Sequence, residues 1–456
     1  MDTIAAIATA QLPSAIGIVR ISGEQARRIL AALFVPVNGV PVEQLPPRRM
    51  SYGTVRSAEG NALDQILAVW FTADHSYTGE ESVELHGHGS PVVLNEILQA
   101  VFAAGARQAR PGEFTKRAFL HGKMDLTEAE AVIDLIDAET AEAARNALSQ
   151  LDGALRRPIE QVYDQLLNIS SQFYAIVDYP DEEIEELTER DIVQTLSRVE
   201  KQLTSFFRTY ERGKILKSGV ATAIIGAPNA GKSSLLNALV GYERTIVTEI
   251  AGTTRDTVEE KAVLGGVLLR LIDTAGIHET GDAVEKLGVE RSRKAVETAD
   301  LIFVLVDGSQ SALTEEDQEA LQLAAKSGKP WIFVQTKKDL FCEKMSLTAV
   351  EEGAQASVAL SSVTGEGIEV LESAIVRLYP KIPAGNTMLS NARQAEAVKR
   401  ALTSVCAAKD ALEEGMTADV VLTEVEEAQN ALGELTGRTA RADMVERIFE
   451  RFCVGK

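Results

Sequence analysis

One eight-residue segment constrains the fold of this chain more than any other. Residues 226–233 read Gly-Ala-Pro-Asn-Ala-Gly-Lys-Ser and match the pattern G-x-x-x-x-G-K-[ST]. The apolar run 220–225 precedes it and the helix-like segment 234–239 follows. A strand, a glycine-rich loop and a helix in this order predict a phosphate-binding loop, because the loop amides and the helix N-terminus point at phosphate oxygens. We expect nucleotide contacts from Asn229, Ala230, Gly231, Lys232, Ser233 and Ser234.

Within this loop the residue types predict distinct roles. Lys232 should reach the β and γ phosphates, and Ser233 should bind Mg²⁺. Further along the chain, Asp273 ends an apolar run and is expected to hold Mg²⁺, mostly through water. The D-x-x-G segment that it opens supplies further nucleotide contacts from Thr274, Ala275 and Gly276. Between the two motifs, residues 252–256 occupy the place of a switch loop, where Thr254 offers its hydroxyl to Mg²⁺.

The base is expected to be guanine. Thr336-Lys337-Lys338-Asp339 follows an apolar run, and the Asp339 carboxylate can accept from both N1–H and the N2 amine of guanine, a donor pair that adenine lacks. The backbone amides of Ser361 and Ser362 are expected to face the guanine O6. These segments resemble the translation-factor-related GTPases, whose usual motif is N-K-x-D. Here Thr336 replaces the Asn that bonds both base and loop, so we expect retained guanine selectivity with weaker affinity.

The pattern along the chain predicts a multidomain α+β protein with a mostly parallel sheet in its inserted P-loop domain. Strands are expected at 16–21, 67–71, 220–225, 268–272, 301–306 and 331–334, and a helix at 90–103 with Pro91 first. Thr127 and Glu130 have capping-box spacing and should open a long amphipathic stretch. We predict an N-terminal α+β domain at 1–120 and one helical domain in two parts, at 121–216 and 383–456. An α/β Ras-like GTPase domain at 217–382 is inserted between these two parts.

Charge and cysteine content narrow the class of protein. With 46 Lys and Arg against 67 Asp and Glu, the net charge of -21 argues against a nonspecific nucleic-acid coat, although not against a specific RNA substrate. Three cysteines exclude a disulfide scaffold and favour a reducing cytoplasm. We expect no membrane segment, since no apolar run approaches ~20 residues. We also expect no secretory signal, because no basic region precedes the apolar stretch in residues 1–10.

Motifs outside the nucleotide site carry a more specific resemblance. They lie at 18–23, 77–81, 85–89, 109–115, 250–256 and 452–456. Together they make the chain similar, nearly end to end, to the tRNA-modification GTPase family called MnmE or TrmE. The usual C-terminal signature of that family is C-I-G-K, and Val454 replaces its Ile here.

The resemblance implies a one-carbon site in the N-terminal domain. Matching family positions bind 5-formyltetrahydrofolate or a related one-carbon tetrahydrofolate, which assigns this role to Arg20, Glu84, Lys123 and Lys456. Taken alone, the first two are equally compatible with a surface ion pair, and Lys123 with a solvated charge. By resemblance Cys453 is catalytic; by itself it is compatible with a helix-packing residue or an inert thiol. His86-Gly87-His88 is interpreted as a turn with packing roles rather than as zinc ligands.

GTP hydrolysis requires a source of positive charge that the sequence does not supply as an arginine finger. Ile277 and His278 stand where many GTPases place a water-orienting Gln. The resemblance implies that a K⁺ ion replaces the finger, held by Asn229, Thr248, Thr253 and the backbone of Ile250, and that Glu285 positions the water. The alternatives are that Asn229 bonds its own loop and that Glu285 lies on a solvated helix face.

The resemblance therefore implies a cytoplasmic, homodimeric, K⁺-activated GTPase. It would act with an FAD- and NADH-dependent partner, MnmG (GidA), in a heterotetramer or larger complex, and modify C5 of the wobble uridine (U34) of certain tRNAs. Two alternatives stay open at this point. One is a ribosome-assembly GTPase switch without carbon chemistry, and the other is a folate-dependent methyl-transfer enzyme with an accessory G domain.

Overall fold

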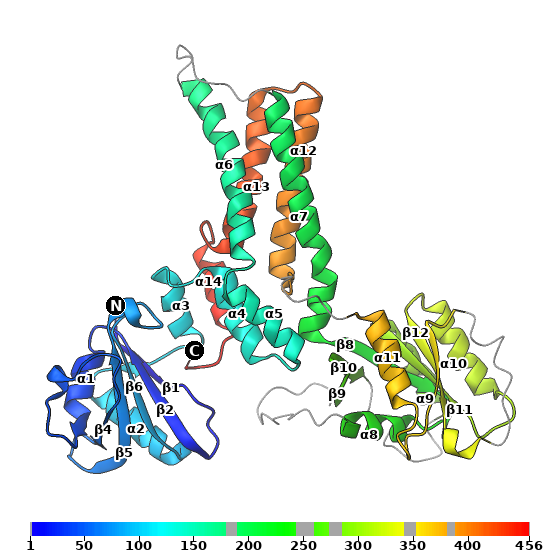
Figure 1. Ribbon diagram of the computed structural model, residues 1–456, viewed down its shortest axis with the longest axis horizontal. Helices are drawn as coiled ribbons and strands as arrows, with labels where there is room; N and C mark the ends of the chain where they lie inside the picture. Colours follow the sequence, from blue (N-terminus) through cyan, green and yellow to red (C-terminus); the bar gives the residue numbers. More distant parts are fainter. Residues whose placement is uncertain are drawn as a thin grey trace. The chain divides into compact units, whose positions relative to one another are not determined.

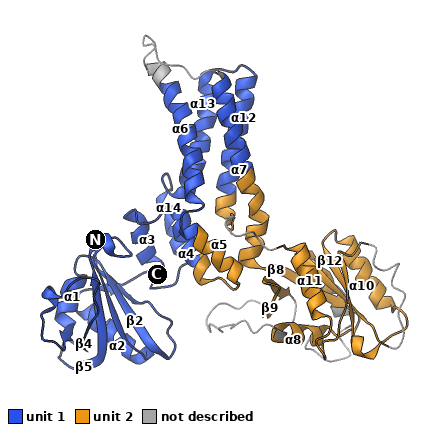
Figure 2. Cartoon of the chain, viewed as in Figure 1, with its two compact units in different colours: residues 1–133, 150–204, 396–456 blue, residues 134–149, 205–395 orange. Residues whose placement is uncertain are grey.

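The computed structural model describes residues 2–178, 189–242, 260–272, 285–341, 353–380 and 388–455 (Figure 1). The chain divides into two compact units (Figure 2). Unit 1 comprises residues 1–133, 150–204 and 396–456, and unit 2 comprises residues 134–149 and 205–395. The four predicted domain boundaries stay predictions. In the described part of the chain, no helix combines the length and apolar character needed to span a membrane.

Unit 1 begins with a seven-stranded sheet of order β3-β4-β5-β6-β2-β1-β7, antiparallel except for β1 and β7. Helices α1 (Ala26–Leu33) and α2 (Pro91–Ala103) bury their apolar sides against one face, in a core that includes Val19, Ile21 and Leu85. The strands are β1 (Ile4–Ile7), β2 (Ser14–Ser22), β3 (Phe34–Pro36), β4 (Ser51–Arg56), β5 (Ala62–Phe71), β6 (Ser82–Gly89) and β7 (Arg107–Gln108). The strands predicted at 16–21 and 67–71, and the helix with Pro91 first, are confirmed.

The interpretation of His86-Gly87-His88 as a turn is wrong. These residues lie inside β6, where Leu67 of β5 and Ile18 of β2 both pair with His86. The reason is the alternation of the strand. Val83 and Leu85 point into the core, so Glu84 and His86 share the opposite face.

The predicted capping box is also displaced, and the long stretch that it opens is broken into several helices. The box forms between Asp125 and Glu128: the Glu128 amide donates to Asp125 Oδ1, and the Asp125 amide donates to Glu128 Oε2, each at 2.8 Å. Thr127 instead donates its hydroxyl to Asp125. A second cap, Thr140, accepts from the Ala143 amide and starts a new helix. The helices are α3 (Glu113–Leu120), α4 (Leu126–Ile136), α5 (Ala141–Leu151), α6 (Arg156–Asp178) and α7 (Glu189–Ser218).

Helices from before and after the P-loop domain pack together in unit 1. Helix α6 contacts α13 (Ala418–Thr436), and the buried Gln429 amide donates to Ser170 Oγ at 3.0 Å. Within unit 1, Lys409 of α12 (Ala392–Glu413) pairs with Glu200 of α7 at 3.0 Å. The last helix, α14 (Ala442–Phe449), contacts α3. This is the discontinuous helical domain that the sequence predicts.

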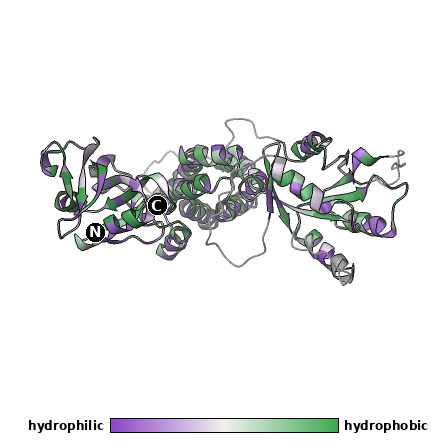
Figure 3. Cartoon of the chain, turned by 90° about the horizontal axis from the view of Figure 1, so that it is seen from below, coloured by the Kyte–Doolittle hydropathy of each residue, from purple (hydrophilic) through white to green (hydrophobic). Residues whose placement is uncertain are grey.

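Unit 2 contains, among its described residues, a six-stranded sheet of order β13-β12-β11-β8-β10-β9, parallel except where β9 meets β10. Most of its strands are coloured as hydrophobic in Figure 3, and separate apolar cores lie against its two faces. The strands are β8 (Val220–Gly226), β9 (Glu260–Leu264), β10 (Val267–Ile272), β11 (Leu301–Asp307), β12 (Trp331–Thr336) and β13 (Ala356–Ala359). The helices are α8 (Lys232–Tyr242), α9 (Glu285–Thr298), α10 (Glu315–Lys326), the 3₁₀ turn η4 (Lys338–Leu340) and α11 (Ile368–Leu378). The predicted strands 220–225, 268–272, 301–306 and 331–334 are confirmed.

Candidate functional sites

The segment 226–233 forms the loop between β8 and α8, in the strand–loop–helix context that the motif requires. Asn229 lies in the left-handed region with φ of 62°, which lets the loop fold back on itself. The Lys232 ammonium donates to the carbonyl oxygens of Gly226 and Ala227, both at 2.8 Å. Burial lowers the pKa of Lys232. The loop thus gathers a cation and a helix N-terminus at one point, which suits a phosphate group.

Thr336 forms a hydrogen bond to this loop, a contact that was not predicted from the sequence. Its hydroxyl lies 2.7 Å from the carbonyl oxygen of Ala230 and 3.1 Å from that of Val306, and the residue is 1% exposed. The replacement of Asn by Thr at this position therefore keeps a hydrogen bond between the end of β12 and the phosphate-binding loop.

Lys337 and Asp339 come directly after Thr336, at the edge of the sheet where β8 leads into the phosphate-binding loop. Lys337 has φ of 56° and precedes η4, on which Asp339 is exposed. The Lys337 ammonium lies 2.6 Å from Asp307 Oδ2 at the end of β11. Burial alone would raise the pKa of Asp307, but hydrogen bonds from Lys337 and Ser309 hold it below its usual value. This pair fixes the backbone from which the Asp339 carboxylate extends.

The two serines predicted to face guanine O6 differ in environment. Ser361 is fully buried, and its amide donates to the carbonyl of Glu366 at 2.8 Å. Its hydroxyl accepts from the Thr364 amide at 3.2 Å. Because the Ser361 amide donates its hydrogen bond within its own loop, it does not serve as the predicted donor to guanine O6. The same role for the Ser362 amide stays a prediction.

Several predicted nucleotide and metal residues lie outside the described residues. They are Thr248, Ile250, Thr253, Thr254, Asp273, Thr274, Ala275 and Gly276, together with Lys456 and the side chain of Glu285 at the start of α9. Their roles stay predictions.

A second cluster lies on the face of the N-terminal sheet opposite α1 and α2. Arg20 of β2 and Glu84 of β6 are register partners, and their side chains form an ion pair at 2.9 Å. His86 Nε2 lies 3.1 Å from the other Glu84 oxygen. The Arg20 guanidinium also lies 5.5 Å from the ring centre of Tyr77 and 5.8 Å from that of Phe114. Both charges are about one-fifth exposed, so the pair is accessible on one side.

The sequence analysis did not assign His86, Tyr77 or Phe114 to this cluster. A signal for His86 was present, because a residue two positions after Glu84 on a strand shares its face. No comparable signal places the two rings, which come from a loop and from α3. Lys123 is exposed, and its ammonium donates to the carbonyl of Asp74, three residues before Tyr77.

The C-terminal segment docks on the same domain. The Gly112 amide donates to the carbonyl of Cys453 at 3.4 Å, and Val454 forms an antiparallel bridge with Pro111. Gly455 has φ of 106°, and a Cβ there would lie 2.4 Å from the carbonyl oxygen of Ile7, so only glycine fits. Since β1 pairs with the strand that carries Arg20, the segment ends beside the sheet of the Arg20 cluster. The Cys453 side chain is exposed.

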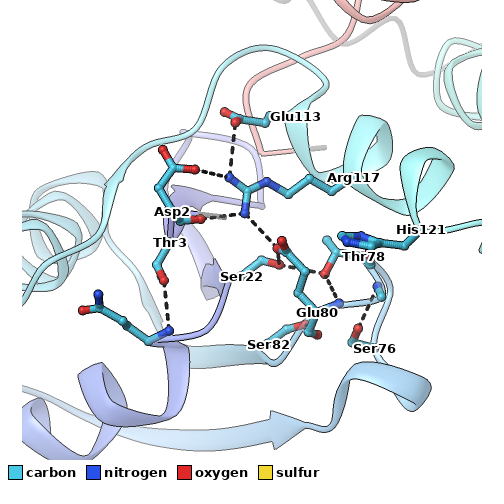
Figure 4. A network of polar contacts seen from close by, with 12 residues as sticks. Asp2, Thr3, Ser22, Ser76, Thr78, Glu80, Ser82, Glu113, Arg117 and His121 are labelled. Carbon is cyan, nitrogen blue, oxygen red and sulfur yellow. Dashed lines mark hydrogen bonds and ion pairs between the residues drawn. The ribbon is translucent and has the colours of Figure 1, made fainter.

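A buried arginine organises the region between the N-terminus and α3 (Figure 4). Arg117 is 4% exposed and donates to Asp2 Oδ1 and Glu80 Oε2, both at 2.8 Å. Ser22 adds a hydrogen bond to the same Glu80 oxygen at 2.9 Å. Because a buried charge must be paired, this network fixes α3 to β2 and to the loop before β6. The sequence analysis did not predict it.

Comparisons with known proteins show the family to which the chain belongs. A family model described as MnmE helical domain matches residues 126–453, and one described as GTP-binding protein TrmE N-terminus matches residues 3–123. The chain belongs to the MnmE family. This membership sets aside the ribosome-assembly alternative, because the matching models cover the N-terminal and helical parts as well as the P-loop domain.

Relatives from the MnmE family match the whole chain. The protein from Alkaliphilus metalliredigens is 41% identical over 100% of this chain and 99% of its own length, and the one from Lactobacillus delbrueckii subsp. bulgaricus is 42% identical over 100% and 98%. Both are named tRNA modification GTPase MnmE. Among solved structures, Era in complex with MgGDPNP and a segment of 16S ribosomal RNA is 26% identical over 40% of this chain and 65% of its own, with a TM-score of 0.27.

Proposed function

We propose that this tRNA modification GTPase acts at C5 of the wobble uridine (U34). A folate-borne one-carbon unit supplies the carbon, and an FAD-dependent partner, MnmG (GidA), acts with it in a heterotetramer or larger complex. The observation that supports the nucleotide part most directly is the hydrogen bond between Thr336 and Ala230, which joins the base-recognition segment to the phosphate-binding loop.

The phosphate-binding loop fits a nucleoside triphosphate. The Lys232 ammonium already points at two loop carbonyls, and phosphate oxygens are stronger acceptors for a partly desolvated cation. In the transition state of phosphoryl transfer, negative charge spreads over the γ-phosphate oxygens, and a fixed cation stabilises it. Ser233 and Thr254 would hold Mg²⁺, which neutralises charge on the same phosphates.

Base selection is assigned to Asp339. Its carboxylate is exposed beside η4, where it can accept two hydrogen bonds from one guanine edge. Because Lys337 is fixed to Asp307 and Thr336 to Ala230, the carboxylate has a defined position relative to the phosphate-binding loop. This arrangement favours GTP over ATP.

Hydrolysis is proposed to depend on K⁺. Asn229 stands in the loop in a left-handed conformation, and Thr248, Ile250 and Thr253 would supply the remaining oxygens. The ion would take the place of an arginine finger, and Glu285 would orient the attacking water. Two subunits would close their P-loop domains on each other around this ion.

The Arg20 cluster is proposed as the folate site. The Glu84 carboxylate suits the donor edge of a pterin, and Arg20, Lys123 and Lys456 provide charges for the folate carboxylates. The same sheet face also exposes Tyr52 and Leu67, which are register partners on β4 and β5. Exposed apolar residues on a sheet face are typical of an association surface, which supports a homodimer formed through this domain.

Cys453 is proposed as the catalytic residue of the carbon chemistry. Its thiol is exposed in a segment docked on the domain that carries Arg20. Replacing Cys453 with Ser should therefore abolish tRNA modification and leave GTP hydrolysis intact.

The proposal is tested by mass spectrometry of tRNA nucleosides from a strain that lacks this protein. We expect the modified wobble uridine to disappear and to return when the wild-type gene is restored. Complementation with Lys232→Ala should fail, because this change removes the cation of the phosphate-binding loop. Unchanged wobble uridines in the deletion strain would contradict the proposed function.

A further inference from the structure

In the described part of the chain, the C-terminal segment 453–455 makes few direct hydrogen bonds to the N-terminal domain. It is attached through the turn 110–112, by the Gly112 amide on the Cys453 carbonyl and by the bridge between Pro111 and Val454. Gly112 has φ of 63°, and a Cβ there would lie 2.5 Å from the carbonyl oxygen of Phe449. The backbone of the turn therefore packs directly against the backbone that leads to Cys453, with no side chain between them. The position of the turn thus sets the position of the C-terminal segment.

Glu113 holds this turn. Its Oε2 accepts from the Arg110 amide at 2.8 Å, across the turn. Arg107 of β7 donates to both Glu113 oxygens, at 2.5 and 2.8 Å, in a bidentate pair. Burial alone would raise the pKa of Glu113, but the hydrogen bonds from Arg107 and Arg110 hold it below its usual value, so the carboxylate stays charged. One side chain thus connects the edge of the sheet to the turn.

We propose that Glu113 is a positioning residue for Cys453. By fixing the turn to β7, it holds the C-terminal segment beside the sheet, so that the thiol stays at a constant place relative to the Arg20 cluster. Glu113 itself touches neither Cys453 nor, in this account, any substrate. The inference rests on the proposed catalytic role of Cys453, and it adds a specific cause for the thiol's placement.

The test separates placement from catalysis. In the full-length chain with Cys342→Ser and Cys406→Ser, a nitroxide spin label on Cys453 reports whether the segment is docked. Because the Cys453 side chain is exposed while its backbone is docked, we expect a spectrum of restricted motion for the otherwise wild-type chain and an additional, more mobile component for Glu113→Ala. Glu113→Gln retains one acceptor oxygen and should lie between the two.

Glu446→Gln is the matched control. Glu446 lies on α14 and forms an exposed ion pair with Lys116 of α3 at 3.9 Å, so the change also removes one carboxylate between the C-terminal region and α3, but away from the turn. We expect its spin-label spectrum to match that of the otherwise wild-type chain, since exposed pairs contribute little.

The second readout is tRNA modification by the unlabelled chain together with its FAD-dependent partner. Because a displacement of about 1 Å can cost ~100-fold in rate, we expect Glu113→Ala to lower the modification rate by about 10-fold or more. GTP turnover by the chain alone should stay within about twofold of wild type, which would show that the P-loop domain is folded and active in the variant.

The outcomes distinguish this inference from the proposed function. Full modification activity of Cys453→Ser would remove the cysteine from the chemistry, while the spin-label spectra would still report on docking. A spin-label spectrum of Glu113→Ala identical to that of the otherwise wild-type chain, together with an unchanged modification rate, would overturn the positioning role of Glu113 whatever the outcome for Cys453.

Discussion

The hydroxyl of Thr336 lies 2.7 Å from the carbonyl oxygen of Ala230, and this hydrogen bond ties the base-recognition segment to the phosphate-binding loop. A shorter side chain thus performs part of the role of the Asn found in the usual motif. The weaker nucleotide affinity that the sequence predicts therefore comes only from the missing contact between this side chain and the base.

Removing this hydroxyl tests its contribution. Thr336→Val keeps the shape of the side chain but leaves buried carbonyls without their donor, which costs about 1–3 kcal/mol. We expect the affinity for GDP to fall by about 5- to 150-fold, measured with a fluorescent GDP analogue. Thr336→Ser retains the hydroxyl and should stay close to wild type. Equal affinities for the Val and Ser variants would show that the hydrogen bond does not support binding.

Asp339→Asn should change the preferred base. An amide at this position donates to the 2-oxo group of xanthine and no longer accepts from the guanine N2 amine. We expect weaker GTP hydrolysis and a gain with xanthosine triphosphate, measured as kcat/KM for both substrates. If the variant prefers GTP as strongly as wild type does, Asp339 does not read the base.

The identity of the monovalent cation should control hydrolysis. Because no arginine finger is evident in the sequence and Asn229 is available as a ligand, GTP turnover should rise steeply when NaCl is replaced by KCl at constant ionic strength. Asn229→Ala should lose this difference. Equal wild-type rates in the two salts would defeat the proposed role of K⁺.

Asp125 should make stability depend on pH. Burial raises its pKa from 3.8 to about 6, so the folded state binds this proton more tightly than the unfolded state. The free energy of unfolding therefore falls as pH rises from about 4 to about 6. Asp125→Asn retains an acceptor for the Glu128 amide and removes the titration. Its stability relative to wild type should increase by about 2–3 kcal/mol between pH 4 and pH 7. Urea unfolding at both values measures this, and a pH-independent difference would contradict it.

Local patterns predicted the strand, loop and helix of the phosphate-binding segment. The segment 226–233 carries its strand, loop and helix within one short stretch, and the apolar runs of a parallel sheet are continuous enough to be recognised. The sequence leaves two interpretations of Arg20 and Glu84, a surface ion pair and a folate site, and the structure contains the ion pair. Alternation along β6 explains why His86 lies on the same face and contacts Glu84.

Features that depend on distant contacts were not predictable in this way. The Thr336–Ala230 bond joins residues more than 100 positions apart. The Arg117 network and the docking of Gly455 against Ile7 likewise depend on how the domain closes. The capping box was misplaced because Thr127 and Asp125 are both good caps, and burial of α4 decides between them.

The loop between β8 and α8 and the segment after β12 are proposed to form one guanine-nucleotide site. The most direct test is isothermal titration of the purified full-length chain with GDP, GTP and ATP in the presence of Mg²⁺. We expect saturable binding of both guanine nucleotides and no competition by ATP. An absence of GDP and GTP binding at millimolar concentration would contradict it.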